Sequence, residues 1–115
     1  MSTKQPKLKK GEVLVLKVVG PGGLAHGGFR WPLAVGAVAK APDWSGLAEC
    51  GGGLHGWLWG VGDLSAIGNW WQQPDSAWMA VAVDGADLVD LHGKVKFPRG
   101  RIFAVSDRAT VATLI

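Results

Sequence analysis

The residues best suited to chemistry lie between Glu49 and Gly60, in the stretch ECGGGLHGWLWG. This stretch holds the only cysteine of the chain, Cys50, and one of its three histidines, His55. A cysteine thiolate is a nucleophile when a neighbouring base activates it, and an imidazole can be that base. Cys50 and His55 are therefore the candidate catalytic pair, although their spacing across a run of glycines matches no established catalytic motif.

The same two side chains could join His26 or His92 in a zinc site, because thiolate and imidazole are zinc ligands. The spacing is not that of a closed structural zinc site, and only one sulfur is present. A lone cysteine is more commonly a small buried apolar residue, and a histidine beside a turn commonly bonds to a backbone carbonyl. The sequence thus predicts no metal and no cofactor.

Tryptophan is the second unusual feature, with seven residues and no tyrosine. If residues 54–59 form a strand, alternation places His55, Trp57 and Trp59 on one face. Such a face can stack a planar ligand, or it can be part of the core. We predict a ligand-binding role for these three residues together with Trp44 from the preceding turn.

The body of the chain contains one basic cluster, in which Arg99 and Arg101 are the residues expected to meet an anionic group on a ligand. The alternative is a solvated strand edge. The full cluster comprises Lys94, Lys96, Arg99, Arg101 and Arg108. The glycine-rich loop 20–28 lacks the Lys-Ser/Thr pair of a phosphate-binding loop and is predicted to be a plain flexible loop.

The net charge of +3 is a property of the N-terminus, where four lysines stand within the first ten residues. The remaining residues carry eight basic and nine acidic side chains, so the body is nearly neutral and nucleic-acid binding is not expected beyond the arm. We predict a flexible arm over 1–11 and one globular domain over 12–115. The single cysteine, with no signal peptide or membrane span in evidence, predicts a cytoplasmic protein.

Alternating apolar runs bounded by turn residues predict strands over 12–19, 54–59, 77–83 and 101–105. Residues 98–100 are predicted to turn. Segments 29–40 and 109–115 are less regular, and each could be a strand or a short helix. Residues 63–71 could form a short helix. Segments 87–91 and 94–97 could be two short strands, or a strand and a turn. The fold class predicted is α+β, a single small domain dominated by a mostly antiparallel sheet with one or two short helices.

At Cys50–His55 the order Cys-x-x-Gly-Leu-His resembles a motif of small uncharacterised proteins from phages and prophages. Gly93-Lys94-Val95-Lys96 and the strand over 101–105 are further matches. Trp57 stands where that family often has a second cysteine, which argues against a two-thiol site. The resemblance implies a phage accessory protein, which would act in the cytoplasm of the host cell.

The hypothesis from sequence is therefore a non-enzymatic phage or prophage protein that binds a small planar or anionic ligand, for example a nucleotide-like host signal. One alternative is a protein-interaction or virion-associated module, working as a homo-oligomer or by binding a host protein. Another is a small enzyme that uses His55 with Cys50 or an acid. The predicted partners are a small anionic ligand and a second copy or another protein, with no membrane.

Overall fold

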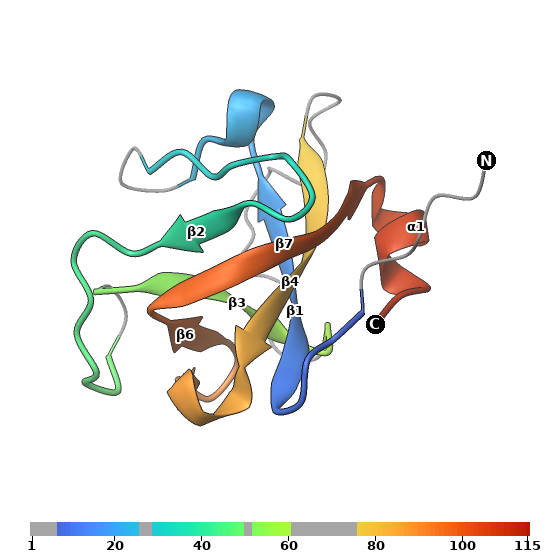
Figure 1. The fold of residues 1–115 in the computed structure, drawn as a ribbon. Coiled ribbons are helices and arrows are strands. Elements are labelled where there is room, and N and C mark those ends of the chain that lie inside the picture. Colours follow the sequence, from blue (N-terminus) through green and yellow to red (C-terminus); the bar gives the residue numbers. More distant parts are fainter. Residues whose placement is uncertain (1–6, 26–28, 50–51, 61–75) are drawn as a thin grey trace.

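Strand β1 (Glu12–Val19) lies at the centre of a seven-stranded sheet (Figure 1). The computed structural model describes residues 7–25, 29–49, 52–60 and 76–115. β1 pairs along its whole length with β4 (Ala77–Asp84) and on its other side with β3 (Leu54–Leu58). β1 is rich in valine, and all residues of β4 but the last are apolar, which suits a central position because apolar side chains can then pack on both faces of the sheet.

The strand order is β2-β7-β4-β1-β3-β6-β5, and all neighbouring pairs are antiparallel. The other elements are β2 (Val38–Lys40), β5 (Val89–Asp90), β6 (Val95–Phe97), β7 (Arg99–Ser106), the helix α1 (Arg108–Ala112) and the 3-10 turns Pro21–Gly23 and Gly85–Asp87. The predicted α+β domain with a dominant antiparallel sheet is confirmed.

The predicted turn over residues 98–100 is wrong, because β7 already begins at Arg99 and only Pro98 separates it from β6. The Pro98 carbonyl accepts a hydrogen bond from Ala41 N (2.8 Å), which ties this corner to the end of β2. Gly100 allows β7 to lie close to the Val81 side chain of β4, where an added Cβ would have no room. Proline lacks the N–H that a strand ladder requires, so it fits the break between two strands.

The weaker sequence predictions have mixed outcomes. The segment 29–40 contributes only the three residues of β2, and the end of the chain adopts the helix alternative in α1. Asp107 caps this helix by accepting a hydrogen bond from Thr110 N (2.7 Å), which satisfies one free donor of its first turn. The predicted helix over 63–71 lies outside the described residues.

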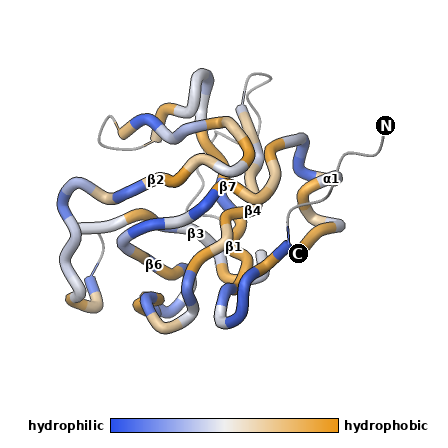
Figure 2. The backbone as a smooth tube through the Cα atoms, in the orientation of Figure 1, coloured by the Kyte–Doolittle hydropathy of each residue, from blue (hydrophilic) through white to orange (hydrophobic). Residues whose placement is uncertain are grey.

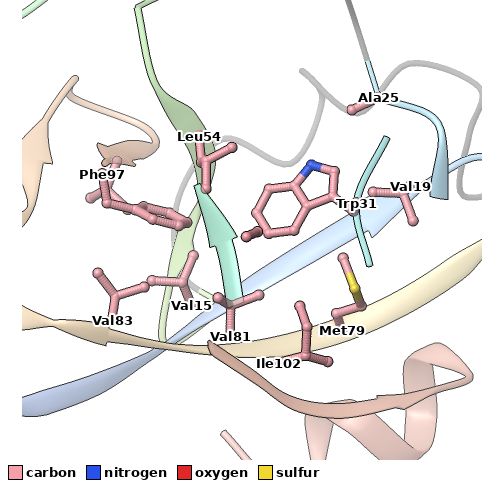
Figure 3. Packing of buried hydrophobic residues seen from close by; sticks show 12 residues of the cluster. Val15, Val19, Ala25, Trp31, Leu54, Met79, Val81, Val83, Phe97 and Ile102 are labelled. Carbon is pink, nitrogen blue, oxygen red and sulfur yellow. The ribbon is translucent and has the colours of Figure 1, made fainter. Parts of the chain in front are cut away.

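The sheet curls, and one face, called the inner face here, encloses most of the core (Figure 3). Its buried side chains come from six of the strands and from the segments before β2 and after β1. Val15, Val81 and Ile102 face Trp31, Leu54 and Phe97 across the enclosed space (Figure 3). The other buried members are Val19, Ala25, Ala39, Met79, Val83 and Val95. We call this set the inner cluster.

The opposite, outer face carries a second buried group, the outer cluster, which lies beneath α1. Val111 of α1 is fully buried in it, and Trp57 and Trp78 are its largest members. The others are Leu14, Leu16, Val18, Ala80, Ala82 and Phe103. Two clusters form because the long central strands are mostly hydrophobic along their length, so that both of their faces are apolar, while hydrophilic residues gather towards the turns (Figure 2). Both faces of β1 and β4 are therefore core.

No helix in the described parts of the chain has the length and apolar character needed to cross a bilayer.

Candidate functional site

β3 divides its side chains between the two clusters. Leu54 packs in the inner cluster and Leu58 against it, whereas Trp57 is only 5% exposed and belongs to the outer cluster. Trp57 lies opposite Leu16 in the register with β1, and Leu16 is also an outer-cluster residue. Alternation along the strand places His55 on the same outer side. Trp57 is therefore part of the core and presents no free ring for stacking.

His55 is half-buried beside a group of lysines. Its register partner on β6 is Lys96, which is fully buried. The pKa of His55 is lowered from 6.5 to about 4, chiefly by burial and then by the positive charges of Lys94, Lys17 and Lys96, while Asp43 opposes the shift. The imidazole is therefore neutral at pH 7, and a proton acceptor with so low a pKa is a weak base at that pH.

Trp44 covers the start of β3 on this side. Its ring carbons lie 3.0 Å from where a Cβ on Gly53 would stand, so the glycine permits the contact. Lys96 Nζ lies 5.7 Å from the centre of the Trp44 ring, within the range of a cation–π interaction. Trp44 remains 40% exposed. The structure thus brings two of the predicted site residues, Trp44 and His55, to a buried lysine, Lys96.

Trp59 lies apart from this group. β3 ends at Leu58, and Trp59 has a φ of +53°, a left-handed conformation that bulky side chains rarely adopt. Trp59 is 44% exposed and lines a groove of about 590 Å³. The other residues of the groove are Leu58, Leu88, Asp90, His92, Gly93, Lys94 and Val95. Alternation predicted Trp59 beside His55, whereas the structure places it with the β5–β6 turn.

Arg101 is held within the domain by an ion pair. Its Nη2 lies 2.7 Å from Glu12 Oε1 and donates a second hydrogen bond to the Lys7 carbonyl at 3.3 Å. The two paired side chains are only 19% and 15% exposed. Despite the cost of burial, hydrogen bonds from the Lys9 backbone and from Arg101 lower the pKa of Glu12. Arg101 thus joins the end of the arm to β1 and β7.

Arg99 has a different environment from Arg101. It is exposed and lies opposite Lys40 in the β2–β7 register, so two like charges stand side by side at the edge of the sheet. Cys50 and His26 lie outside the described residues. Among the described residues, no three His, Cys, Asp or Glu side chains gather in a metal-binding arrangement.

Sequence reasoning missed Asp90 and Leu88 as neighbours of a predicted tryptophan. The signal available in the sequence is the pair His92-Gly93, which stands between the predicted short strands 87–91 and 94–97 and is suited to a tight turn between them. The Leu91 N–H donates to the Lys94 carbonyl across this turn at 2.9 Å, so Asp90 and Lys94 are brought to the two sides of one hairpin. That the hairpin would lie beside the end of β3 depends on the β3–β6 pairing, which the sequence does not reveal.

Comparison with known proteins identifies one group of relatives. The chain is 27% identical to the ice nucleation protein InaU of Pantoea ananas over 110 residues, covering 94% of this chain and 10% of that protein. It is 32% identical to an ice nucleation protein of Pseudomonas syringae over 106 residues, covering 90% of this chain and 9% of that protein. A third relative, from Enterobacter agglomerans, is 27% identical over 110 residues.

The chain therefore spans about a tenth of the length of the curated relatives it matches. No protein-family model matches the chain. No solved structure matches it either.

These relatives overturn the resemblance to phage proteins and the function inferred from it. That resemblance rested on a few short motifs, chiefly the six residues from Cys50 to His55, whereas the similarity to ice nucleation proteins runs through nine-tenths of the chain. The description as a phage or prophage protein that binds a planar or anionic ligand is wrong. A glycine-rich phrase with one cysteine and one histidine recurs too easily to identify a family.

Proposed function

We propose that this chain serves ice nucleation as an accessory globular domain and does not itself provide the surface that orders water. The observation that carries the proposal is the extent of the similarity, which covers 90–94% of this chain but only 8–10% of each ice nucleation protein. The activity in the name of those proteins belongs to a much longer chain. What this chain matches is one domain-sized portion of it.

The geometry of the sheet supports an accessory role. A template for ice has to offer a broad, flat face on which similar polar groups recur at regular intervals. Here the strands range from two to eight residues, and the sheet curls around the inner cluster. Adjacent strands in such sheets are twisted by roughly 20–25°. Both faces of β1 and β4 are occupied by apolar side chains, so the centre of the sheet offers no polar array.

The sequence also lacks the periodicity from which regular surfaces are built. Solenoid proteins repeat a unit of roughly 20–50 residues, so that equivalent side chains stack in rows. No such repeat is evident in the 115 residues of this chain. The domain is better suited to holding, ending or connecting a regular structure than to being one.

The test is a domain exchange read out by droplet freezing. The matching segment of the Pantoea ananas protein InaU is replaced by this chain, and freezing temperatures are compared with those of the parent and of a deletion of the same segment. We expect the chimaera to freeze droplets near the temperature of the parent and the deletion to freeze them lower. The purified chain alone should leave droplets freezing at the temperature of buffer.

Two glycine variants of the chimaera provide matched controls. Gly56→Val introduces a side chain where there is no room for a Cβ, whereas Gly46→Val enters open space. The first should behave as the deletion and the second as the intact chimaera. Droplets nucleated by the purified chain alone would show that its own surface orders water and would contradict the proposal, as would a chimaera indistinguishable from the deletion.

An accessory domain acts through contact with protein. We therefore propose that this chain binds either a second copy of itself or another protein. Leu33, Val35 and Val38 support it, because these apolar side chains are 39–55% exposed at and before the edge strand β2. Light scattering on the purified chain separates the two cases. A mass that rises with concentration indicates self-association, and a constant monomer mass leaves contact with another protein. The predicted cytoplasmic location stays a prediction.

A further inference from the structure

The groove at the end of β3 has an apolar floor joined to the core. Leu58 and Leu88 pack against the inner cluster, and Val95 is a member of it. Trp59, which is 44% exposed, lines the same groove. The volume of about 590 Å³ is within the range of roughly 300–1,000 Å³ usual for small-molecule sites. The groove thus combines a supported floor with one free aromatic surface.

The backbone holds Trp59 in this place at a cost. Its φ of +53° lies in the left-handed region, which is unfavourable for a bulky residue. Two hydrogen bonds hold the conformation, from Trp59 N to the Leu14 carbonyl at 2.9 Å and from Gly60 N to the Trp57 carbonyl at 3.0 Å. Among the described residues, the only other non-glycine residue with positive φ is His92, which lines the same groove. Conformations of this kind concentrate at functional sites.

The rim of the groove offers both donors and acceptors of hydrogen bonds. Asp90 and His92 are largely exposed, and the Asp90 carboxylate accepts a hydrogen bond from His92 N at 2.9 Å, which fixes the turn between them. His92 Nδ1 stands 3.9 Å from the second carboxylate oxygen. Lys94 brings one positive charge to the lining and Asp90 one negative charge. This balance offers no net attraction to a strongly charged ligand.

We infer that this groove is a binding site for an uncharged sugar. The π face of an indole is electronegative and attracts the slightly positive C–H hydrogens on one side of a pyranose ring. The hydroxyls at the edge of the same ring would then reach the rim, where the Asp90 carboxylate accepts hydrogen bonds and the His92 imidazole either donates or accepts them. A nucleotide would bring the negative charge of its phosphate to a lining whose one positive charge, on Lys94, is already balanced by Asp90, so the groove offers it no net electrostatic attraction. The site goes beyond the proposed accessory role and does not depend on it.

The experiment is a titration of the purified chain, followed through its backbone and indole N–H resonances by NMR. The probes are uncharged sugars: glucose, galactose, mannose, N-acetylglucosamine, maltose and cellobiose. Glucose 6-phosphate and AMP serve as anionic comparisons. We expect at least one neutral sugar to shift the Trp59 indole resonance and the amides of residues 90–94 in a saturable manner. Trp59→Ala should weaken binding about tenfold or more, and Asp90→Asn several-fold.

Trp44→Ala is the matched control, because Trp44 is about as exposed as Trp59 but does not line the groove. It should leave the affinity unchanged. If Trp59→Ala fails to fold, the wild-type resonance map and Asp90→Asn still decide the matter. Saturation by none of the neutral sugars, stronger binding of the anionic probes, or shifts confined to the surroundings of Trp44 would each overturn the inference. So would self-association abolished by Trp59→Ala, which would assign the groove to protein contact.

Discussion

Gly56→Ala tests how closely β1 and β3 approach each other. An added Cβ at this position would lie against Val15 Cγ1 and only 2.7 Å from the Leu16 carbonyl oxygen. The valine methyl could rotate away, but the carbonyl belongs to the backbone of the central strand and cannot move without displacing β1. A methyl group therefore fits only if the two strands separate locally.

The expected cost follows from two opposing effects. Overpacking of a well-packed core costs about 1–3 kcal/mol, and the upper part of that range applies where the obstacle is backbone. Replacing glycine by alanine also restricts the unfolded chain, which returns about 0.4–1 kcal/mol. We therefore expect Gly56→Ala to lower the free energy of unfolding by about 2 kcal/mol. For a domain of this size that corresponds to a fall in Tm of about 8 °C.

Urea unfolding followed by far-ultraviolet circular dichroism at pH 7 measures the change directly. With a slope of about 2 kcal/mol per molar urea, the midpoint should fall by about 1 M. Gly46→Ala is the control, because Gly46 is exposed and an added Cβ would meet nothing within 4 Å. It should be neutral or slightly stabilising. Equal midpoints for the two variants would refute the close approach of β1 to β3.

Two further predictions concern charge inside the domain. Because the pKa of His55 is lowered to about 4 in the folded state, its contribution to stability is complete above pH 6.5 and is lost as the pH falls from 6.5 to 4. Allowing for partial exposure, the free energy of unfolding should fall by about 1–2 kcal/mol over this range. Urea midpoints measured between pH 6.5 and 4 should show this fall in the wild-type chain and not in His55→Asn. Burial, and then the charge of Lys94, lower the pKa of Lys17 from 10.5 to about 8, so at pH 7 Lys17 is charged in both states and the full cost of burying the charge is present. Lys17→Met should raise the free energy of unfolding at pH 7 by about 1–3 kcal/mol. A lower urea midpoint for this variant would show instead that the cation–π contact of Lys17 Nζ with the Trp31 ring, at 5.4 Å from the ring centre, outweighs the cost of burying the charge.

The strands could be predicted because their signal is local. Alternation and branched side chains between Gly11 and Gly20 define β1, and those between Pro74 and Asp84 define β4. Pro98 misled the prediction, because proline and glycine within three residues usually mark a turn. Here they mark a corner between two strands, and the space that Gly100 leaves for Val81 becomes visible only when β4 is beside it.

The site was harder to predict because exposure is set by strands distant in the chain. Trp57 and Trp59 look alike in the sequence, yet one is covered by the outer cluster and the other stands free. The difference comes from where β3 ends and from the left-handed turn at Trp59. In the same way Arg101 looked available for a ligand, whereas the order β1-β4-β7 brings it to Glu12. Neither arrangement can be read from local pattern.

The pairing of β1 with β4 has a consequence for how the chain folds. Val19 is opposite Ala77 and Glu12 is opposite Asp84, so the two central strands are separated by half of the chain or more. During synthesis β1 would emerge with two apolar faces and wait for its main partner until β4 had left the ribosome. Domains dominated by such non-local pairs fold slowly, and their unpaired strands are prone to associate with other chains in the meantime. The central strand is thus the most secure part of the finished fold and the most vulnerable part of the nascent chain.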